Sequence, residues 1–477
     1  MKLVNLKNPV MASWLREQGF RLDAPPFLSG AIEARKLLEQ LPVKKEPLAS
    51  LTTGHNGGIF NGPKFARTYV DAPEHGVPFV GSSDMLQADL SRLPLLRKTD
   101  AYSPALSYLR LEEGMTLISC SGTIGRMVYV RSDMAGMWSS QHVMKVVPNP
   151  DQILPGYLYA FLSSKFSVPL IAGGTYGAII QHIEPHHIAP LQIPRFGEGF
   201  EARIHTLMER AVHLLGIYQT TIVKATENVF ERTGVHNLTP IEWLRDSSDL
   251  GFHVRRSEIE FLRAWNHSRR AERIKQEIKS GRWSLLGDLV DAEWLKWRMM
   301  FKRIDANPEF GIEVITQRPL FQLFPEGRWL SRAYLLNHSP RYVVPDQTIL
   351  IAKQGTLGED ELYCRCEFIT GRRMLHRAYS DHCMRVVVRE GVIDPGYLFA
   401  FLRSHAGFRL LRGLSEGSKQ QDLHWRTVPT LPIPRCDEAD EAKIGDAVRS
   451  AYEARNTAVE LILEAQQLIE SAIEEAA

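Results

Sequence analysis

The chain has 477 residues, of which 44% are hydrophobic and 23% charged; this is ordinary for a globular protein and favours two or three domains. No apolar run approaches the roughly 18 residues of a membrane helix. The N-terminus has no continuous apolar signal core, so we expect a cytoplasmic protein without membrane contact. Five cysteines at irregular spacing argue against a disulfide framework and favour reduced thiols.

The net charge of +2 is small, but its distribution is uneven. Residues 437–477 carry eleven acidic and three basic side chains, so the rest of the chain carries +10. Residues 253–303 carry thirteen Lys and Arg against seven acids. A basic body fits contact with phosphates, with a separate role for the acidic end. A solvated charged face is the simpler alternative.

One sequence pattern occurs twice in the same order, which indicates an internal repeat. The run from Ile153 to Leu162 matches the run from Ile393 to Leu402, 240 residues later, around a shared Pro-Gly-Tyr-Leu. The other matched blocks are Gly76–Val80 with Gly311–Ile315, Gly122–Gly125 with Gly355–Gly358, His142 with His382, Lys145–Val147 with Arg385–Val387, and Ile193–Arg195 with Ile433–Arg435. We therefore predict one fold present twice, with small loop insertions between the copies.

Each copy is predicted to mix short strands with a helix. Residues 116–120 and 347–352 are β-type runs that lead into a glycine turn, and residues 142–147 and 382–388 are further strands. Pro155 and Pro395 stand where proline is tolerated, in a first helical turn. The helices that follow carry apolar residues on a recurring face. The predicted class is therefore α+β.

A longer helix is predicted behind each module, because small or apolar residues recur every seven positions. They are Ile204, Ala211, Tyr218 and Ala225 in the first copy, and Ile444, Ala451, Ala458, Ala465 and Ala472 in the second. Sustained heptads favour a close-packed helix pair or a coiled coil. An ordinary amphipathic helix on its own domain is the alternative. Two such arms can pack antiparallel and relate the modules by a pseudo-twofold axis.

The N-terminal segment resembles the piece that follows the first arm. Trp14-Leu15-Arg16-Glu17 is similar to Trp243-Leu244-Arg245-Asp246, as if a circular arrangement had been cut at one point. The predicted domains are an N-terminal segment (1–45), a first module (46–197), a central helical arm with a basic connector (198–280), a second module (281–436) and a C-terminal helical arm (437–477).

The sequence offers no convincing catalytic constellation. It has neither a GxGxxG nor a Walker A loop. Asn307-Pro308-Glu309-Phe310 lacks the second proline that an amino-methyltransferase loop requires. Glu277-Ile278-Lys279 has the nuclease E-x-K spelling but lies in a run that reads as charged helix. We therefore predict no catalytic residue.

The histidines are also interpreted as structural. His182, His186 and His187 cluster together, but the second copy does not keep them, so no metal site is predicted. His142 and His382 recur within predicted strands, where a hydrogen-bonded structural histidine is the better interpretation than a general base.

Polar, glycine-containing turns recur in both copies and suit nucleic acid. Glycine lets the backbone approach phosphate, Ser, Thr and Lys donate to phosphate oxygens, and Gln pairs with adenine edges. Plain surface turns are the alternative, which the recurrence disfavours. The predicted DNA-binding residues are Ser121, Thr123, Gly174, Thr175, Tyr176 and Gln181 in the first copy, and Lys353, Gln354, Thr356, Ser418, Lys419, Gln420 and Gln421 in the second.

Taken in order, these motifs resemble the specificity (S) subunit of type I restriction-modification systems over nearly the whole chain. The resemblance rests on the strand with its Gly-Thr-Ile/Leu-Gly turn, the Pro-Gly-Tyr-Leu helix start, the Gly-rich turn, the Ile-Pro-Arg exit and the long helix. It implies two target-recognition domains separated by helical arms. Each domain would recognise one half of a split site in double-stranded DNA, and the arm length would set the spacing.

The same resemblance implies a subunit that is not an enzyme and binds no cofactor directly. A partner methyltransferase would bring S-adenosylmethionine and modify adenine, and a restriction or translocase subunit can join. Residues 238–281 are long and basic for a connector, and the segment before Leu51 is also long. The alternatives are therefore a specificity subunit of a related phage-defence modification system, a self-contained DNA-acting enzyme with an unrecognised active site, and a scaffold that binds protein.

Overall fold

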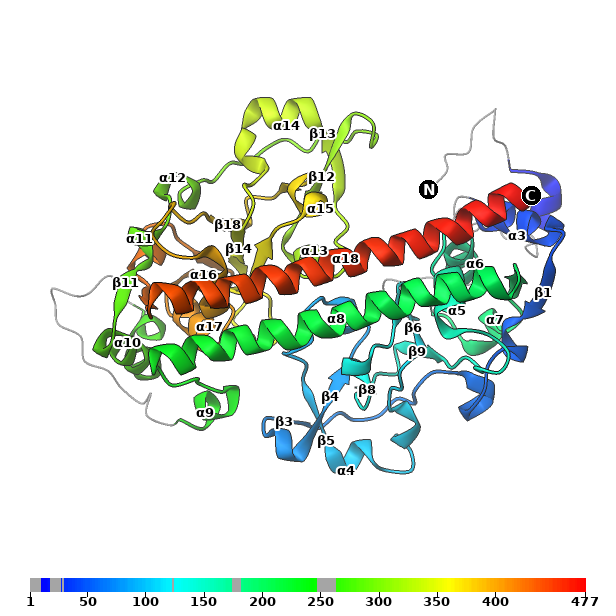
Figure 1. Ribbon diagram of the computed structural model, residues 1–477, viewed down its shortest axis with the longest axis horizontal. Coiled ribbons are helices and arrows are strands. Elements are labelled where there is room, and N and C mark those ends of the chain that lie inside the picture. The colour runs from blue at the N-terminus through cyan, green and yellow to red at the C-terminus, as the bar shows by residue number, and fades with distance from the viewer. Residues whose placement is uncertain (1–9, 18–26, 28–29, 122–123, 174–181, 247–262) are drawn as a thin grey trace. The chain divides into compact units, whose positions relative to one another are not determined.

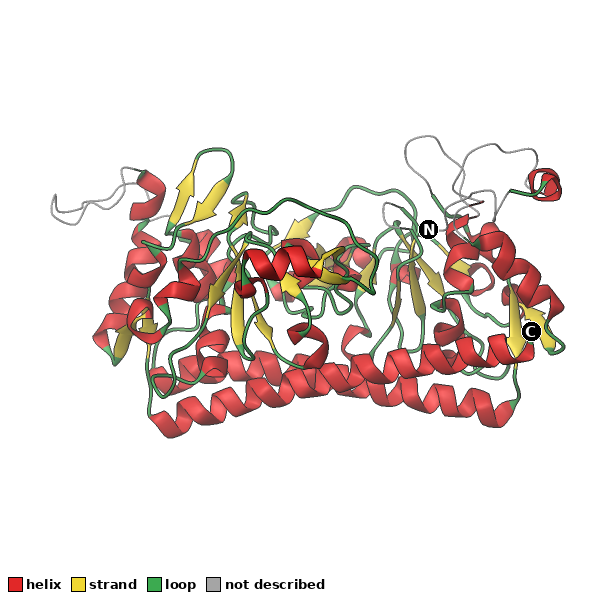
Figure 2. Ribbon diagram, turned by 90° about the horizontal axis from the view of Figure 1, so that it is seen from above, coloured by secondary structure: helices red, strands yellow, loops and turns green. Residues whose placement is uncertain are grey.

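The computed structural model describes residues 10–17, 27, 30–121, 124–173, 182–246 and 263–477. Helices and short strands are mixed throughout these ranges (Figure 2), which confirms the predicted α+β class. Within the same ranges, no helix has the length and apolar character needed to cross a membrane.

Contacts divide the chain into two compact units that are not contiguous in sequence. The first unit is Met1–Gly216 with Thr457–Ala477, and the second is Ile217–Asn456. The predicted arms are the long helices α8 (Glu198–Thr233) and α18 (Glu438–Ala476), green and red in Figure 1. Each unit therefore contains one module, the beginning of the arm that follows it and the end of the other arm.

The remaining elements of the first unit are short. Its helices are α1 (Ala12–Glu17), α3 (Ala31–Gln40), α4 (Lys98–Ala101), α5 (Pro155–Leu162), α6 (Ser167–Gly173) and α7 (Pro185–Ile188). Its strands are β1 (Lys44–Pro47), β2 (Ile59–Phe60), β3 (Tyr69–Val70), β4 (Gly76–Val80), β5 (Leu95–Arg97), β6 (Thr116–Ser119), β7 (Met127–Tyr129), β8 (Trp138–Ser139), β9 (Val143–Val146) and β10 (Gln192–Arg195).

The second unit contains a corresponding series. Its helices are α9 (Pro240–Arg245), α10 (Arg269–Ser280), α11 (Leu286–Leu289), α12 (Ala292–Leu295), α13 (Gln317–Leu320), α14 (Arg332–His338), α15 (Arg372–Leu375), α16 (Pro395–Leu402) and α17 (His405–Arg412). Its strands are β11 (Trp283–Leu285), β12 (Gly311–Ile315), β13 (Arg328–Ser331), β14 (Thr348–Ala352), β15 (Gln354–Gly355), β16 (Cys366–Ile369), β17 (Ala378–Tyr379), β18 (Cys383–Val386), β19 (Ser415–Gly417), β20 (Gln421–Leu423) and β21 (Pro432–Pro434).

The sheets of the two units share one topology. In the first unit β4 lies between β5 and β8, and β6 lies between β7 and β9. In the second unit β12 lies between β13 and β17, and β14 lies between β16 and β18. Phe79 pairs with Trp138 and Val314 with Ala378, which are equivalent positions in parallel pairs. Since a one-residue slip would turn every side chain to the other face, the shared register means that the repeat has one fold in both units.

The cores lie on equivalent strands but are filled differently at one position. Trp138 is buried in the first unit, where its indole N–H donates to the carbonyl of Leu106 at 3.0 Å. The equivalent residue of the second unit is the small Ala378, and Trp297 packs into the same cluster from the segment before β12. The two cores therefore keep an indole but take it from different parts of the chain.

The Pro-Gly-Tyr-Leu motif begins a buried helix in each unit, α5 and α16, with proline in the first turn as predicted. The glycine allows this helix to meet the arm at backbone contact. A Cβ on Gly156 would lie 2.8 Å from Nδ1 of His205, and one on Gly396 would lie 2.8 Å from Cα of Gly445. Any larger residue would push the module away from its arm.

The tyrosine of the motif holds the exit strand, β10 in the first unit and β21 in the second. The Tyr157 hydroxyl donates to the carbonyl of Pro194 at 2.5 Å, and the Tyr397 hydroxyl donates to that of Pro434 at 2.8 Å. All four positions keep the 240-residue spacing. A buried tyrosine needs a partner for its hydroxyl, so this bond links the helix and the strand in one arrangement.

The Ile-Pro-Arg exit fixes the first turn of each arm. Arg195 donates to both carboxylate oxygens of Glu201 at 3.0 and 2.8 Å, and Arg435 donates to those of Glu441 at 2.7 and 2.9 Å. Both glutamates are buried near a helix N-terminus, where a negative charge is favourable. The bidentate geometry gives the arm a defined direction as it leaves the module.

The segments before the modules belong to the repeat. In the first unit α3 packs against α6 and β1 pairs with β10; in the second, α10 packs against α17 and β11 pairs with β21. The buried residues of the two helices are 240 apart: Ala31, Ala34 and Leu38 against Ala271, Ile274 and Ile278. The described part of the basic stretch after α8, from residue 263 onward, therefore belongs to the second unit.

Within the second unit, the two arms run antiparallel. The Tyr218 ring of α8 meets the Tyr452 ring of α18 with centroids 5.5 Å apart. Near the C-terminal end of α8, Nε of Arg232 lies 3.8 Å from the carboxylate of Asp440, in the first turn of α18. Residue numbers thus rise along one helix while they fall along the other.

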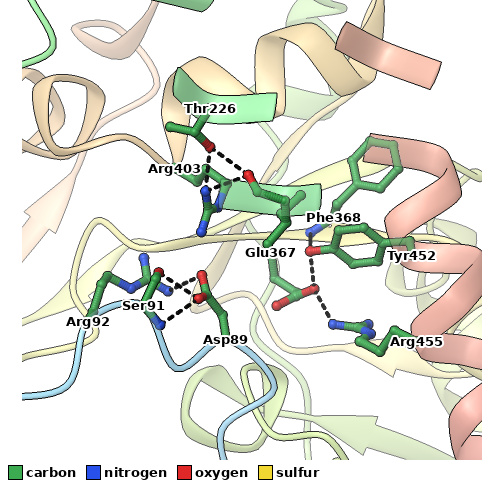
Figure 3. Close-up of polar contacts among 10 residues, drawn as sticks. Asp89, Ser91, Arg92, Thr226, Glu367, Phe368, Arg403, Tyr452 and Arg455 are labelled. Carbon is green, nitrogen blue, oxygen red and sulfur yellow. Dashed lines mark hydrogen bonds and ion pairs between the residues drawn. The ribbon is translucent and has the colours of Figure 1, made fainter. Parts of the chain in front are cut away.

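A buried ionic group joins α18 to the sheet of the second unit (Figure 3). Glu367 of β16 accepts hydrogen bonds from the Tyr452 hydroxyl at 2.7 Å and from Nη1 of Arg455 at 2.9 Å. None of the three residues is more than 5% exposed. Burial alone would lower the pKa of Arg455, but the neighbouring Glu367 carboxylate raises it. The charges therefore stay paired, and the helix is held in one register on the strand.

The far end of each arm meets the other copy's module at equivalent positions. In the first unit the Gln466 side chain donates to the Ser163 hydroxyl at 2.8 Å. In the second, Arg403 donates to the carbonyl of Ile222 at 2.9 Å and to the hydroxyl of Thr226 (Figure 3). Ser163 and Arg403 are 240 residues apart, as are Thr226 and Gln466. Each unit is thus completed by the arm that follows the other module.

Replacing Arg455 by methionine is expected to destabilise the protein by about 3–5 kcal/mol, because it leaves the Glu367 carboxylate buried without its cation. Urea unfolding measures the change. The double variant R455M/E367Q, which also removes the buried charge, should recover most of the loss. A loss below about 1 kcal/mol, the size of a surface pair, would contradict this role.

Candidate nucleic-acid interface

In the second unit, the two groups of predicted DNA-binding residues come together in one small sheet. β20 lies between β15 and β19, with Gln354 opposite Asp422 and Gly355 opposite Gln421. β19 and β20 form a hairpin whose tip is residues 418–420. The turn after β14 and the hairpin after α17 therefore form one polar site, although they are more than fifty residues apart in the sequence.

The predicted residues of this site differ in exposure. Thr356, Ser418, Lys419 and Gln420 are exposed, and Gln354 is half-buried. Lys353 and Gln421 are only 4% and 3% exposed, so their side chains support the site from inside. The Gln421 amide donates to the carbonyl of Ser418 at 2.5 Å and accepts from Arg263 at 3.0 Å. Alternation along β20 turns Gln421 inward, which residue type alone did not reveal.

The first unit brings the same two loops together. Ser121 bridges to His182, as Gln354 pairs with Asp422 in the second unit. Ser121 is half-buried, and its hydroxyl lies 2.8 Å from Nδ1 of His142. The predicted residues Thr123, Gly174, Thr175, Tyr176 and Gln181 lie outside the described residues.

The recurring histidine contacts the same loop in both units. Nδ1 of His142 is hydrogen-bonded to Ser121, and Nδ1 of His382 is hydrogen-bonded to the side-chain oxygen of Gln354. Each histidine lies in the turn just before a strand, β9 or β18, and its bond holds a residue two positions after the end of the central strand, β6 or β14. The geometry agrees with the structural interpretation of these histidines.

Sequence reasoning missed the residues that complete the second site. The Gln317 amide donates to the carbonyl of Gln354 at 2.9 Å and accepts from its N–H at 3.0 Å. Asp422 accepts from the Gln354 amide at 3.3 Å and lies 3.7 Å from Arg298, which is exposed. Neither Gln317 nor Arg298 belongs to a matched block, so the repeat gave no signal for them.

Arg67 and Gln141 complete the first site and were also missed. Arg67 donates to the Gln141 side-chain oxygen at 2.7 Å, and the Gln141 amide nitrogen lies 3.2 Å from Nε2 of His142. Burial, with the positive charge of Arg67 nearby, lowers the pKa of His142. The neutral imidazole is thereby favoured, with one nitrogen donating and the other accepting.

A buried cation lies behind each site at equivalent positions. Lys145 donates to the carbonyls of Val143 at 2.9 Å and Ser140 at 3.4 Å, and is fully buried. Arg385 donates to the equivalent carbonyls of Cys383 at 2.7 Å and Ser380 at 3.3 Å. Burial lowers the pKa of Lys145 to about 7 and that of Arg385 to about 10. Each cation therefore fixes the turn that leads into β9 or β18, next to the histidine.

The chemistry of both sites is that of hydrogen bonding and charge, because each brings together side chains that carry hydroxyl, amide, imidazole or guanidinium groups. Such groups bind phosphates and base edges. Among the residues that the structure describes, no group of three or more His, Cys, Asp or Glu side chains is arranged to hold a metal ion.

Comparison with known proteins found similar solved structures, but no protein-family model and no curated protein matched. The S subunit of a type I restriction-modification system from M. genitalium is 12% identical, with 92% of this chain and 96% of that chain covered and a TM-score of 0.38. The HsdS subunit from Thermoanaerobacter tengcongensis is 12% identical, with 91% and 97% covered and a TM-score of 0.27.

A third chain, from work on complex assembly and conformational transition of the type I R-M system, is 10% identical, with 92% and 98% covered and a TM-score of 0.27. The chain is similar to type I restriction-modification S subunits.

The buried Lys145 predicts a pH dependence of stability. Its folded pKa lies below the ordinary value, so the unfolded chain binds more protons between pH 7 and 10 and the contribution of Lys145 to stability rises with pH. Relative to K145M, the wild type should gain about 2 kcal/mol between pH 7 and 9. Urea unfolding of both proteins at several pH values measures the difference.

The equivalent variant R385M is the control. In the wild type, Arg385 stays protonated up to about pH 10. The difference in stability between the wild type and R385M should therefore stay flat from pH 7 to 9. A flat difference for K145M as well would contradict the lowered pKa of Lys145.

Proposed function

We propose that this chain is a non-catalytic DNA specificity subunit that recognises a two-part site and directs a partner adenine methyltransferase to it. Each unit would recognise one half-site through its pair of polar loops. S-adenosylmethionine would be bound by the partner, and a restriction or translocase subunit could join the same complex. The sequence resemblance to type I S subunits supports each of these roles.

One observation carries the proposal: the same backbone site occurs twice with different side chains. Ser121 and His182 in the first unit correspond to Gln354 and Asp422 in the second, while the supporting histidine is the same. A hydroxyl and an imidazole offer different hydrogen bonds from an amide and a carboxylate. Two sites built on an equivalent backbone pair, with different side chains on it, fit the recognition of two different short sequences.

The direct test uses the chain in complex with its methyltransferase and a pool of duplexes that contain a randomised segment. The selected duplexes should share two short sequence blocks separated by a fixed spacer, and adenines within the blocks should become methylated. Methyl transfer by the chain alone, with S-adenosylmethionine and DNA, would contradict the non-catalytic role. A scaffold that binds protein would select no sequence and show no salt-dependent DNA binding.

The hairpin tip should act on one half-site only. The variant K419A/Q420A removes two exposed side chains of the second unit, and loss of base contacts is expected to cost about 1–3 kcal/mol at that half-site. Binding to duplexes with either block altered, measured at one salt concentration, separates the two halves.

A matched control changes the same residue types on the outer part of α10, in the variant K275A/Q276A. This variant should leave both half-sites unaffected. Equal losses at both halves for K419A/Q420A would count against independent recognition by the two units.

A further inference from the structure

The turn that follows β14 in the second unit is held by a buried arginine of α17. Arg412 donates from Nη1 to the carbonyl of Leu357 and from Nη2 to that of Gly358, both at 2.7 Å. Its side chain is 1% exposed. One planar guanidinium thus spans two successive carbonyls of the turn that carries Thr356.

A second arginine of the same helix holds the end of this turn. Arg409 is 2% exposed, and it contacts both carboxylate oxygens of Glu359, with Nη1 donating to Oε1 at 2.9 Å. Burial would raise the pKa of Glu359, but the Arg409 charge lowers it, so the carboxylate stays ionised. A bidentate pair fixes the orientation of both side chains.

Aromatic rings keep both guanidinium groups in place. The Phe408 centroid lies 4.2 Å from Cζ of Arg412, and the Trp243 centroid of α9 lies 4.7 Å from Cζ of Arg409. Nε of Arg412 is buried without a hydrogen-bond partner among the described residues. A buried, unpaired donor is destabilising, and such local costs are expected where a side chain serves function.

In the first unit, the equivalent helix positions carry no charged side chain. Positions 240 residues before Arg409 and Arg412 are Pro169 and Ala172. A Cβ on Gly125, the counterpart of Gly358, would lie 3.7 Å from Val168 and 3.9 Å from Ala172. Arg412 supplies a guanidinium beside the turn in the second unit. Ala172, the equivalent residue of the first unit, supplies a methyl group there.

We propose that Arg409 and Arg412 are positioning residues that hold the Gln354–Glu359 turn in one conformation, so that the second unit discriminates sharply among bases at its half-site. They act through the turn and do not touch DNA. The first unit, with Pro169 and Ala172, does not depend on them. This role rests on the proposed function.

The test uses R412M in the full chain, complexed with its methyltransferase and selected on the same randomised duplexes. We expect at least about a tenfold loss of discrimination at bases of the second block, with the first block unchanged. Amide hydrogen exchange of residues 355–361 should become faster. R412K, which can still donate to the turn carbonyls, should restore much of the discrimination.

A matched control is R377M. Arg377 is 8% exposed in the same unit and binds Glu313 at 2.8 Å and the carbonyl of Pro325 at 3.0 Å, away from the turn. Its loss should lower the melting temperature but leave both sequence blocks and the exchange of residues 355–361 unchanged. E359Q removes the charge that pairs with Arg409, and because the Glu359 side chain is half exposed, this variant should still fold. It should lose discrimination at the second block in the same way, so it tests the same role if R412M fails to fold.

The outcomes separate the two proposals. A wild-type complex that selects no two-block sequence overturns the proposed function and this role with it. A wild type that selects two blocks, with R412M and E359Q as discriminating as the wild type, overturns the positioning role alone. Equal loss in R377M, or equal loss at both blocks in R412M, also overturns it.

Discussion

The structure depends on the close contact between the Pro-Gly-Tyr-Leu helix and the arm that follows it. Gly156 and Gly396 leave no room for a Cβ at this contact. The tyrosine that follows each glycine bonds to a proline carbonyl of the exit strand. The arginine of that strand pairs with a glutamate in the first turn of the arm. Because these bonds recur at one spacing, each arm leaves its module in the same direction. That direction allows the far end of each arm to complete the other unit.

Scaffold and loops obey different constraints in this chain. Three scaffold contacts bury polar groups that must be satisfied, and at these the partners keep their chemistry in both units: tyrosine with a proline carbonyl, arginine with glutamate, a cation with two carbonyls. At the loops, the backbone pairing is kept while the side chains change from Ser121 to Gln354 and from His182 to Asp422. Solvent can satisfy those groups, so their chemistry is free to follow a ligand.

Local patterns predicted the two long helices, the two Pro-Gly-Tyr-Leu helices and four of the strands. Proline at a first helical turn, heptads of small residues and matched strand runs each specify an element by themselves, and all were found where expected. The partners of the loops were not predictable in this way. Gln317 and Arg67 reach the sites from segments outside the matched blocks. Lys353 and Gln421 looked like exposed polar residues, but both are buried, Gln421 by alternation along β20, and that depends on tertiary pairing.

The support of each recognition turn varies independently of the scaffold. Ala172 and Arg412 occupy one position of the repeat and lie beside the equivalent glycine of the turn, yet neither shares an atom with the tyrosine or arginine bonds that hold the arm. A change from methyl to guanidinium at this position therefore alters how a turn is held without altering how the module is built. Under the proposed function, separation of this kind would let two copies of one fold acquire different specificities within one chain.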